Sequence, residues 1–222
     1  MTDRRDLLRM LAAAAPATLG SGFWPAIALA QARGAGLIAA NVCRLTPAST
    51  EGPYYLDPVL NRADIREDRE GAAMDLALQV VTEDCRPISG ARVDVWHCDA
   101  QGRYSGVAGV GGQFLRGSQF SDRTGAVRFR TIFPGWYPGR TTHVHFKVWL
   151  GQREALTGQA FFADDVADAI ERADPAYRRD TNAGRIGNAA DGIARRAGEG
   201  AYARVRQLPD GIDAAMVIGV AL

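Results

Sequence analysis

The residues best suited to chemistry form a short histidine-containing stretch in the second half of the chain. His143 and His145 are two of the three histidines in 222 residues and stand one residue apart. From His143 to Trp149 the residues are mostly β-branched or aromatic, which is typical of a strand. Side chains alternate between the faces of a strand, so both imidazoles point the same way and could chelate one metal ion. A half-buried strand with two hydrogen-bonded histidines is the alternative.

Two tyrosines are the other candidate ligands. Tyr137 lies in the turn 134–139, which holds two prolines and two glycines, and Tyr104 follows the alternating segment 91–98. Two phenolates and two imidazoles make a hard donor set suited to a trivalent ion, and tyrosinate is an attested iron ligand. Copper or zinc is the alternative metal. Tyr104, Tyr137, His143 and His145 could therefore converge on one metal ion, although either tyrosine taken alone is more often a core or surface residue than a ligand.

Short alternating segments separated by turn residues predict the scaffold. Strands are expected at 74–81, 91–98, 126–132 and 214–220. A further strand is expected to begin at residue 143, and another to end near residue 162. The first two are expected to pair as a hairpin. A helix is expected over 164–173 with Asp164 as its cap, and the glycine-rich loop 106–117 is long enough to be functional. The pattern favours a mainly β fold: an antiparallel β-sandwich with Greek-key links, long active-site loops and one or two short helices.

The N-terminal residues are predicted to be a targeting signal rather than part of the folded domain. Arg4 and Arg5 form a twin-arginine pattern, an apolar run follows, and 28–30 reads Ala-Leu-Ala, a small-x-small cleavage site. We therefore expect a twin-arginine export signal at 1–30, a single domain at 31–222, and a periplasmic or secreted protein. Glycines and a proline interrupt the short apolar run, so no stable membrane anchor is expected. A frayed basic N-terminus is the alternative.

Charge and cysteine content limit the classes of binding partner and the disulfides that the chain can form. The chain has 26 basic and 25 acidic residues, and removing residues 1–30 leaves equal numbers of each. No basic field is available for nucleic acid or an anionic membrane. Of the three cysteines, Cys43 and Cys85 are favoured as a disulfide, while Cys98 is expected to be a buried small hydrophobe. Their spacing matches no zinc motif.

Several motifs occur together in a fixed order. They are Glu51-Gly52-Pro53-Tyr54-Tyr55, Val93-Asp94-Val95-Trp96-His97, Gly102-Arg103-Tyr104-Ser105, Arg130-Thr131-Ile132 with Pro134-Gly135-Trp136-Tyr137-Pro138, Arg140-x-x-His143-x-His145-Phe146, and Gln159 before Phe161-Phe162. As an ordered set, covering roughly residues 45–165, they resemble the intradiol ring-cleavage dioxygenases of the catechol and protocatechuate type.

The resemblance implies a function as well as a fold. It implies Fe(III) held by the four predicted ligands, with a small aromatic diol and O2 as substrates and a muconate-type diacid as product. Arg140 would lie beside the substrate ring and stabilise negative charge, and Gln159 would hydrogen-bond in the pocket. Tyr137 would leave the metal, and either Tyr137 or a hydroxide bound as fifth ligand would take up a substrate proton. Tyr54 would line the pocket. His97 occupies a position that is not a ligand in the family, and we expect it to be structural.

Two departures from the family pattern affect what can be carried over. Thr141-Thr142 stands where the family often has Pro-Ala, which could alter how Arg140 points. The helical dimerisation segment of the bacterial catechol enzymes is expected to be absent, so the oligomeric state stays open. A non-catalytic, extracytoplasmic β-sandwich module that grips a ligand with its aromatic turn is the alternative function.

Overall fold

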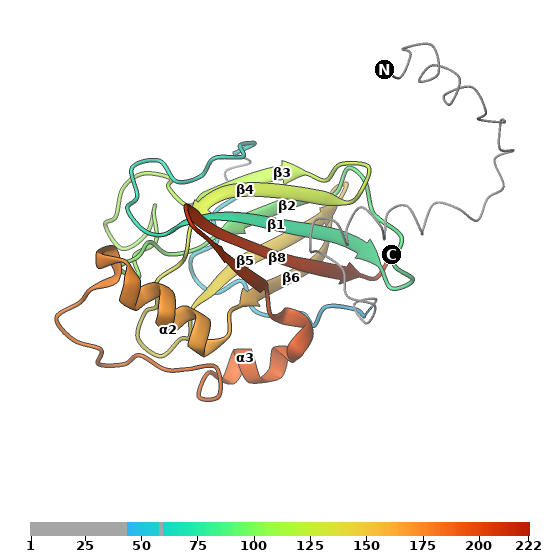
Figure 1. Ribbon diagram of the computed structural model, residues 1–222. Helices are drawn as coiled ribbons and strands as arrows, with labels where there is room; N and C mark the ends of the chain where they lie inside the picture. The colour runs from blue at the N-terminus through green and yellow to red at the C-terminus, as the bar shows by residue number, and fades with distance from the viewer. Residues whose placement is uncertain (1–43, 58–59) are drawn as a thin grey trace, which may run out of the picture.

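The computed structural model describes residues 44–57 and 60–222, which form a two-layer β-sandwich (Figure 1). One sheet has the strand order β4-β1-β8-β7 and the other has β3-β2-β5-β6. The strands are β1 (Ala73–Thr82), β2 (Arg92–Trp96), β3 (Arg116–Phe120), β4 (Ala126–Ile132), β5 (His143–Leu150), β6 (Arg153–Phe161), β7 (Arg204–Leu208) and β8 (Gly211–Val220). The predicted fold class is confirmed. One detail differs, because β1 and β8 run parallel and make their sheet mixed.

Alternation along the strands separates the core from the functional face. In β5, Val144, Phe146 and Val148 are fully buried and belong to the core between the two sheets. The intervening residues His143 and His145 therefore lie on the opposite face of the sheet. The period-2 pattern of this strand thus places both imidazoles away from the sandwich core, on one side of the β3-β2-β5-β6 sheet.

The predicted hairpin between the first two strands is wrong. β1 pairs with β4 and β8, whereas β2 pairs with β3 and β5. The segment 83–91 crosses from one sheet to the other instead of turning back within one sheet. Both strands bury an apolar face, and packing these faces against each other across the sandwich satisfies the same alternation that suggested a hairpin.

The helices are short and lie together beside the sheets, at the lower side of Figure 1. α2 (Asp164–Ala173) has the predicted bounds, but its N-cap is Ala163, so Asp164 is the first helical residue and not the cap. The polar, glycine-rich segment 174–200 holds η1 (Pro175–Tyr177), α3 (Gly192–Ala197) and the start of η2 (Glu199–Ala201). Within the described ranges, no helix combines the length and the apolar character that crossing a membrane requires.

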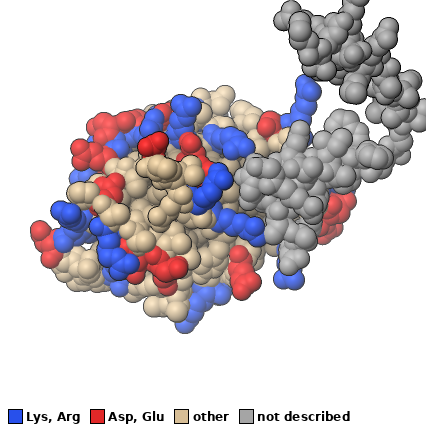
Figure 2. Space-filling view, in the orientation of Figure 1, with Lys and Arg blue, Asp and Glu red and all other residues tan. Residues whose placement is uncertain are grey.

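Other predictions fall partly or wholly outside the described residues. The export signal 1–30 and Cys43 are among them, so the signal and the boundary of the domain at residue 31 stay predictions. Cys85 is disulfide-bonded, and Cys98 is a buried free thiol whose Sγ donates to Gly135 O at 3.3 Å. On the face shown in Figure 2, basic and acidic side chains are interspersed, as a net charge of +1 leads one to expect.

Candidate metal centre

A row of residues across three neighbouring strands forms the floor of the site. In the register of the sheet, His145 on β5 faces Trp96 on β2 and Gln159 on β6. The indole of Trp96 stacks on the imidazole of His145, with ring centroids 4.9 Å apart and planes 11° apart. Cross-strand neighbours on one face are held rigidly by the ladder, so β2 and β6 fix the orientation of His145.

The two tyrosines come from segments that cross each other closely. Tyr104 follows β2, and Tyr137 lies in the turn before β5. A Cβ atom at Gly102 would lie 2.3 Å from Trp136 O, and one at Gly135 would lie 2.4 Å from Ala100 O. Only glycine allows backbones to approach this closely. The glycines of both motifs therefore explain how two phenols far apart in the sequence meet beside the histidine strand.

The four predicted ligands converge. Tyr137 Oη lies 3.3 Å from His143 Nε2, and His143 Nε2 lies 3.1 Å from His145 Nε2. The ring of Tyr104 makes edge contacts with Tyr137 at 5.7 Å and with His145 at 6.2 Å between centroids. His143 Nδ1 donates to Thr141 O at 2.7 Å, which leaves the lone pair on Nε2 directed at the cluster.

Burial determines the protonation of these groups. It lowers the pKa of His143 to about 3 and that of His145 well below its usual range, and Arg140 adds to both shifts. Both imidazoles are thus neutral at neutral pH, as metal ligation requires. Burial raises the pKa of Tyr104 and of Tyr137, while the nearby Arg140 opposes the shift of Tyr137. The phenols keep their protons unless another cation replaces them.

The donor set fits a ferric ion. Tyr104 Oη and His145 Nδ1 are buried and have no hydrogen-bond partner among residues 44–57 and 60–222. An unsatisfied buried hydroxyl costs about 1–3 kcal/mol, which coordination through Oη would offset. No cluster of three His, Cys, Asp or Glu side chains exists in the described part of the chain, so the phenols are essential to this centre. Two phenol oxygens and two imidazole nitrogens form the hard set that Fe(III) prefers.

Arg140 and Gln159 flank the cluster. Arg140 Nη1 lies 3.4 Å from Tyr137 Oη and 3.5 Å from His143 Nε2. Arg140 Nη2 donates to Gln159 Oε1 at 2.5 Å, and Gln159 Nε2 donates to Thr50 O at 2.9 Å. Despite the threonines that follow it, Arg140 points at the cluster.

The segment 49–57 lies across the same face of the sheet. Tyr54, half-buried, stacks on Tyr104 with ring centroids 4.4 Å apart. Lys147 Nζ lies 2.5 Å from Glu51 Oε2, and Tyr55 Oη donates to Asp94 Oδ2 at 3.0 Å. These contacts fix the segment at two points beyond the ligands, with Tyr54 between them as part of the wall of the site.

Comparisons with known proteins identify the family of the chain. A family model described as Dioxygenase matches residues 49–183. The structure is similar to that of an intradiol ring-cleavage dioxygenase from Tetranychus urticae, with a TM-score of 0.76 and 30% identity over 81% of this chain and 95% of that one. The chain belongs to the intradiol ring-cleavage dioxygenase family.

Curated relatives in this dioxygenase family match over a shorter part. Catechol 1,2-dioxygenase 1 of Acinetobacter lwoffii is 29% identical over 140 residues, which is 51% of this chain and 45% of the relative. Chlorocatechol 1,2-dioxygenase of Pseudomonas sp. strain P51 is 30% identical over 145 residues, which is 55% of this chain and 58% of the relative. The matched part spans about half the length of these curated relatives.

Two residues that contact the candidate site were not foreseen from the sequence. Arg116 is 2% exposed and donates to Tyr54 O at 2.6 Å and to Ser105 O at 2.7 Å, which ties together the two segments that carry Tyr54 and Tyr104. Asp191 accepts from Arg140 Nε at 2.8 Å. Neither has a local signal, since an arginine or an aspartate in a polar stretch is usually solvated.

His97 is structural, as predicted. It is fully buried, its Nδ1 lies 2.8 Å from Cys98 O, and its Nε2 lies 2.7 Å from Thr131 Oγ1. Both ring nitrogens are therefore already paired within the protein, which leaves neither available to a metal.

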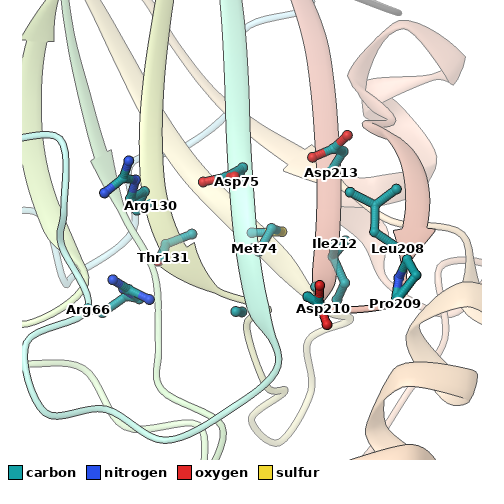
Figure 3. Close-up of a pocket in the computed structure, with 12 residues that line it drawn as sticks. Arg66, Met74, Asp75, Arg130, Thr131, Leu208, Pro209, Asp210, Ile212 and Asp213 are labelled. Atoms are coloured by element: carbon teal, nitrogen blue, oxygen red, sulfur yellow. The ribbon is translucent and has the colours of Figure 1, made fainter.

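A separate hollow of about 490 Å³ lies on the outer face of the mixed sheet (Figure 3). Arg66 and Arg130 stand on one side of β1, and Asp210 and Asp213 stand on the other. None of the predicted site residues lines this hollow. Its lining carries two arginines and three aspartates, and it shows no donor set comparable with that of the metal centre.

Proposed function

We propose that the protein is a non-haem ferric dioxygenase that cleaves the ring of a catechol-type diol between its two hydroxyls with O2, giving a muconate-type diacid. One observation carries the proposal: Tyr137, His143 and His145 lie within hydrogen-bonding distance of one another, the ring of Tyr104 is in edge contact with Tyr137 and His145, and a guanidinium lies beside them. Membership of the family supports it. The named relatives act on catechol and chlorocatechol, so a small aromatic diol is the proposed substrate class.

Tyr104, Tyr137, His143 and His145 would hold the ferric ion. When bound, Fe(III) supplies Lewis acidity that favours the doubly deprotonated form of a catechol. The fold supports this deprotonation by keeping water away from the ligands. Tyr104, His143 and His145 are 4%, 2% and 1% exposed, and electrostatic interactions are stronger in such a buried setting than in water.

Tyr137 is placed to handle a proton. Of the two phenols it is the more exposed, and its Oη is within 3.4 Å of Arg140 Nη1. Burial raises its pKa although Arg140 opposes the shift, so Oη can hold a proton received from the diol at neutral pH. Tyr104 is enclosed and lies against Tyr54, which suits a ligand that stays in place.

Arg140 and Gln159 orient the ring and stabilise charge. The Nη1 end of the guanidinium faces the cluster, where it would stabilise negative charge that develops on the substrate. Gln159 holds Nη2 and is itself held by Thr50 O, so neither group has to reorganise during the reaction. Tyr54 and the neighbouring Val107, which packs against the aromatic cluster, form the wall that selects ring substituents.

A visible absorption spectrum tests the proposal first. Ferric-loaded protein is expected to show a tyrosinate charge-transfer band that moves when catechol is added without oxygen, and to consume O2 when air is admitted. Tyr55→Phe is a matched control, because its hydroxyl pairs with Asp94 and not with the cluster, and it should keep the band. A protein that stays colourless after ferric reconstitution would refute the proposal. Metal analysis showing tightly held copper or zinc would replace the ferric assignment.

We also propose that residues 1–30 direct export through the twin-arginine route, so that the protein acts in the periplasm or outside the cell. The Arg4-Arg5 pair and the small-x-small site support this. Replacing both arginines with lysine keeps the charge but should retain the protein in the cytoplasm, as measured by cell fractionation. Unchanged export of this variant would contradict twin-arginine recognition.

A further inference from the structure

Asp191 is a buried carboxylate just before α3. It lies beyond residues 49–183, which the family model matches, and its side chain is 1% exposed. Burying a carboxylate is costly unless its oxygens are satisfied by charge and hydrogen bonds. The hydrogen-bond partners of its two oxygens therefore indicate the role of Asp191 in the structure.

The two oxygens of Asp191 serve different groups. Oδ1 accepts from the backbone N–H of Ile193 at 2.8 Å and of Ala194 at 3.2 Å, which caps α3. Oδ2 accepts from Arg140 Nε at 2.8 Å and from the N–H of Thr141 at 3.0 Å. A proline at position 141 would have no N–H for this second contact. The helix cap and the arginine contact thus depend on separate atoms and can be separated by mutation.

Arg140 is consequently held along its length. Asp191 binds Nε and Gln159 binds Nη2, so Nη1 is the nitrogen that faces Tyr137 Oη and His143 Nε2. An arginine side chain carries about 2 kcal/mol of rotamer entropy. Fixing Nε removes most of that freedom and sets the plane of the guanidinium before a substrate arrives.

The charge state of Asp191 suits this role. Burial pushes its pKa upward, but the Thr141 N–H and the Arg140 guanidinium together pull the pKa below its ordinary value. The carboxylate is therefore ionised at neutral pH and forms a charge-assisted bond with Nε. Such bonds are roughly twice as strong as neutral ones.

We propose that Asp191 is the positioning residue for Arg140 and holds its guanidinium over the metal centre. This inference rests on the proposed function, because the role of Arg140 is defined by that reaction. If Asp191 has this role, the active site depends on the segment at the start of α3, which lies outside the residues that the family model matches.

A double-mutant cycle tests the proposal. Asp191→Asn keeps Oδ1 as a helix cap, since Asn caps as well as Asp, but its amide turns N–H donors toward Arg140. The four proteins are wild type, Asp191→Asn, Arg140→Gln and the double variant, each measured for kcat, KM, the ferric band and the Tm of the metal-free form. Asp174→Asn is the matched control, because Asp174 caps η1 through Ala176 N and its described hydrogen bonds do not involve Arg140.

The expected result is a specific pattern. Asp191→Asn should keep the ferric band and lose roughly 10- to 100-fold in kcat/KM, mostly in kcat, as misplaced catalytic groups do. The same change should have little further effect once Arg140 is Gln, and Asp174→Asn should have little effect on either background. The Tm values should show the same non-additivity.

Two results would overturn the proposal: an equal loss on both backgrounds, or loss of the ferric band in Asp191→Asn. If Asp191→Asn does not fold, Asp191→Ser carries the same test, since Ser keeps one capping oxygen and lacks the second. A wild-type protein that binds iron but turns over no catechol would defeat the proposed function instead. The Arg140–Asp191 coupling would then be decided by the Tm cycle alone.

Discussion

Replacing Tyr104 with Phe should change stability in opposite directions with and without metal. The side chain of Tyr104 is 4% exposed, and its hydroxyl has no hydrogen-bond partner among the described residues. In the metal-free protein this hydroxyl is a buried polar group that has lost its hydration. In the ferric protein it is a ligand. Removing it therefore relieves a cost in one state and removes a stabilising bond in the other.

The magnitudes follow from these two environments. An unsatisfied buried hydroxyl costs about 1–3 kcal/mol, so metal-free Tyr104→Phe should be more stable than wild type by about 1 kcal/mol. For a domain of this size that is an increase of about 2–4 °C in Tm. In the presence of Fe(III) at 100 times its Kd, wild type gains about 2.7 kcal/mol from binding. The variant, which lacks one of four ligands, should lose most of that gain.

Thermal unfolding of both forms, followed by circular dichroism, measures the effect. Tyr177→Phe is the matched control, because its buried hydroxyl is satisfied: it donates to Phe133 O at 2.5 Å and accepts from Ala72 N at 3.2 Å. The control should lower Tm equally with and without iron. If Tyr104→Phe lowers the Tm of the metal-free protein as the control does, the hydroxyl has a structural partner and the reasoning is wrong.

Three further predictions concern other parts of the molecule. Burial lowers the pKa of His97 to about 4 in the folded protein, whereas an unfolded histidine has a pKa of about 6.5. As pH falls, the unfolded state therefore binds the proton first. Up to roughly 3 kcal/mol of stability should be lost between about pH 6.5 and about pH 4. His97→Gln should flatten the plot of unfolding free energy against pH in that window, and an unchanged slope would exclude His97 as its source. Gly135→Ala places Cβ 2.4 Å from a backbone carbonyl and should weaken iron binding and lower Tm, whereas Gly111→Ala meets open space and should do neither; equal iron affinities would contradict the crossing argument. Lys147→Met removes the ion pair that holds the segment 49–57, and hydrogen exchange there should quicken, while unchanged exchange would show that other contacts suffice.

Local patterns in the sequence predict much of the site. The strand that carries His143 and His145, the turn with Tyr137 and the helix 164–173 are each defined by residues next to one another. Alternation and turn chemistry are local properties, so they can be recognised without knowledge of the partners. The grouping of the four ligands needed the ordered motifs in addition, because the two loops that carry the tyrosines cross at glycines far apart in the chain.

The parts that could not be predicted depend on distant contacts. The sequence of β3, Arg-Gly-Ser-Gln-Phe, has no apolar alternation, and it is a strand because it pairs with β2. The hairpin prediction failed because alternation says that a strand has a buried face but not which strand lies beside it. Asp191 stands in a polar, glycine-rich stretch, and its role appears only when the fold brings it 2.8 Å from Arg140 Nε, 51 positions away in the sequence.

The buried charges around the cluster favour an anionic occupant. Arg116 is buried next to the Tyr104 ring, Arg140 lies beside Tyr137 and His143, and Asp191 compensates Arg140. Arg116 donates only to neutral oxygens of Ser105 and Tyr54, and its Cζ lies 6.0 Å from the centroid of the Tyr104 ring. One positive charge is thus left without a carboxylate partner among the described residues, in a setting where screening by water is weak. This charge opposes part of the effect of burial, which keeps the phenols protonated in the metal-free protein, and so favours ligation by the tyrosines and binding of the diol in its deprotonated form.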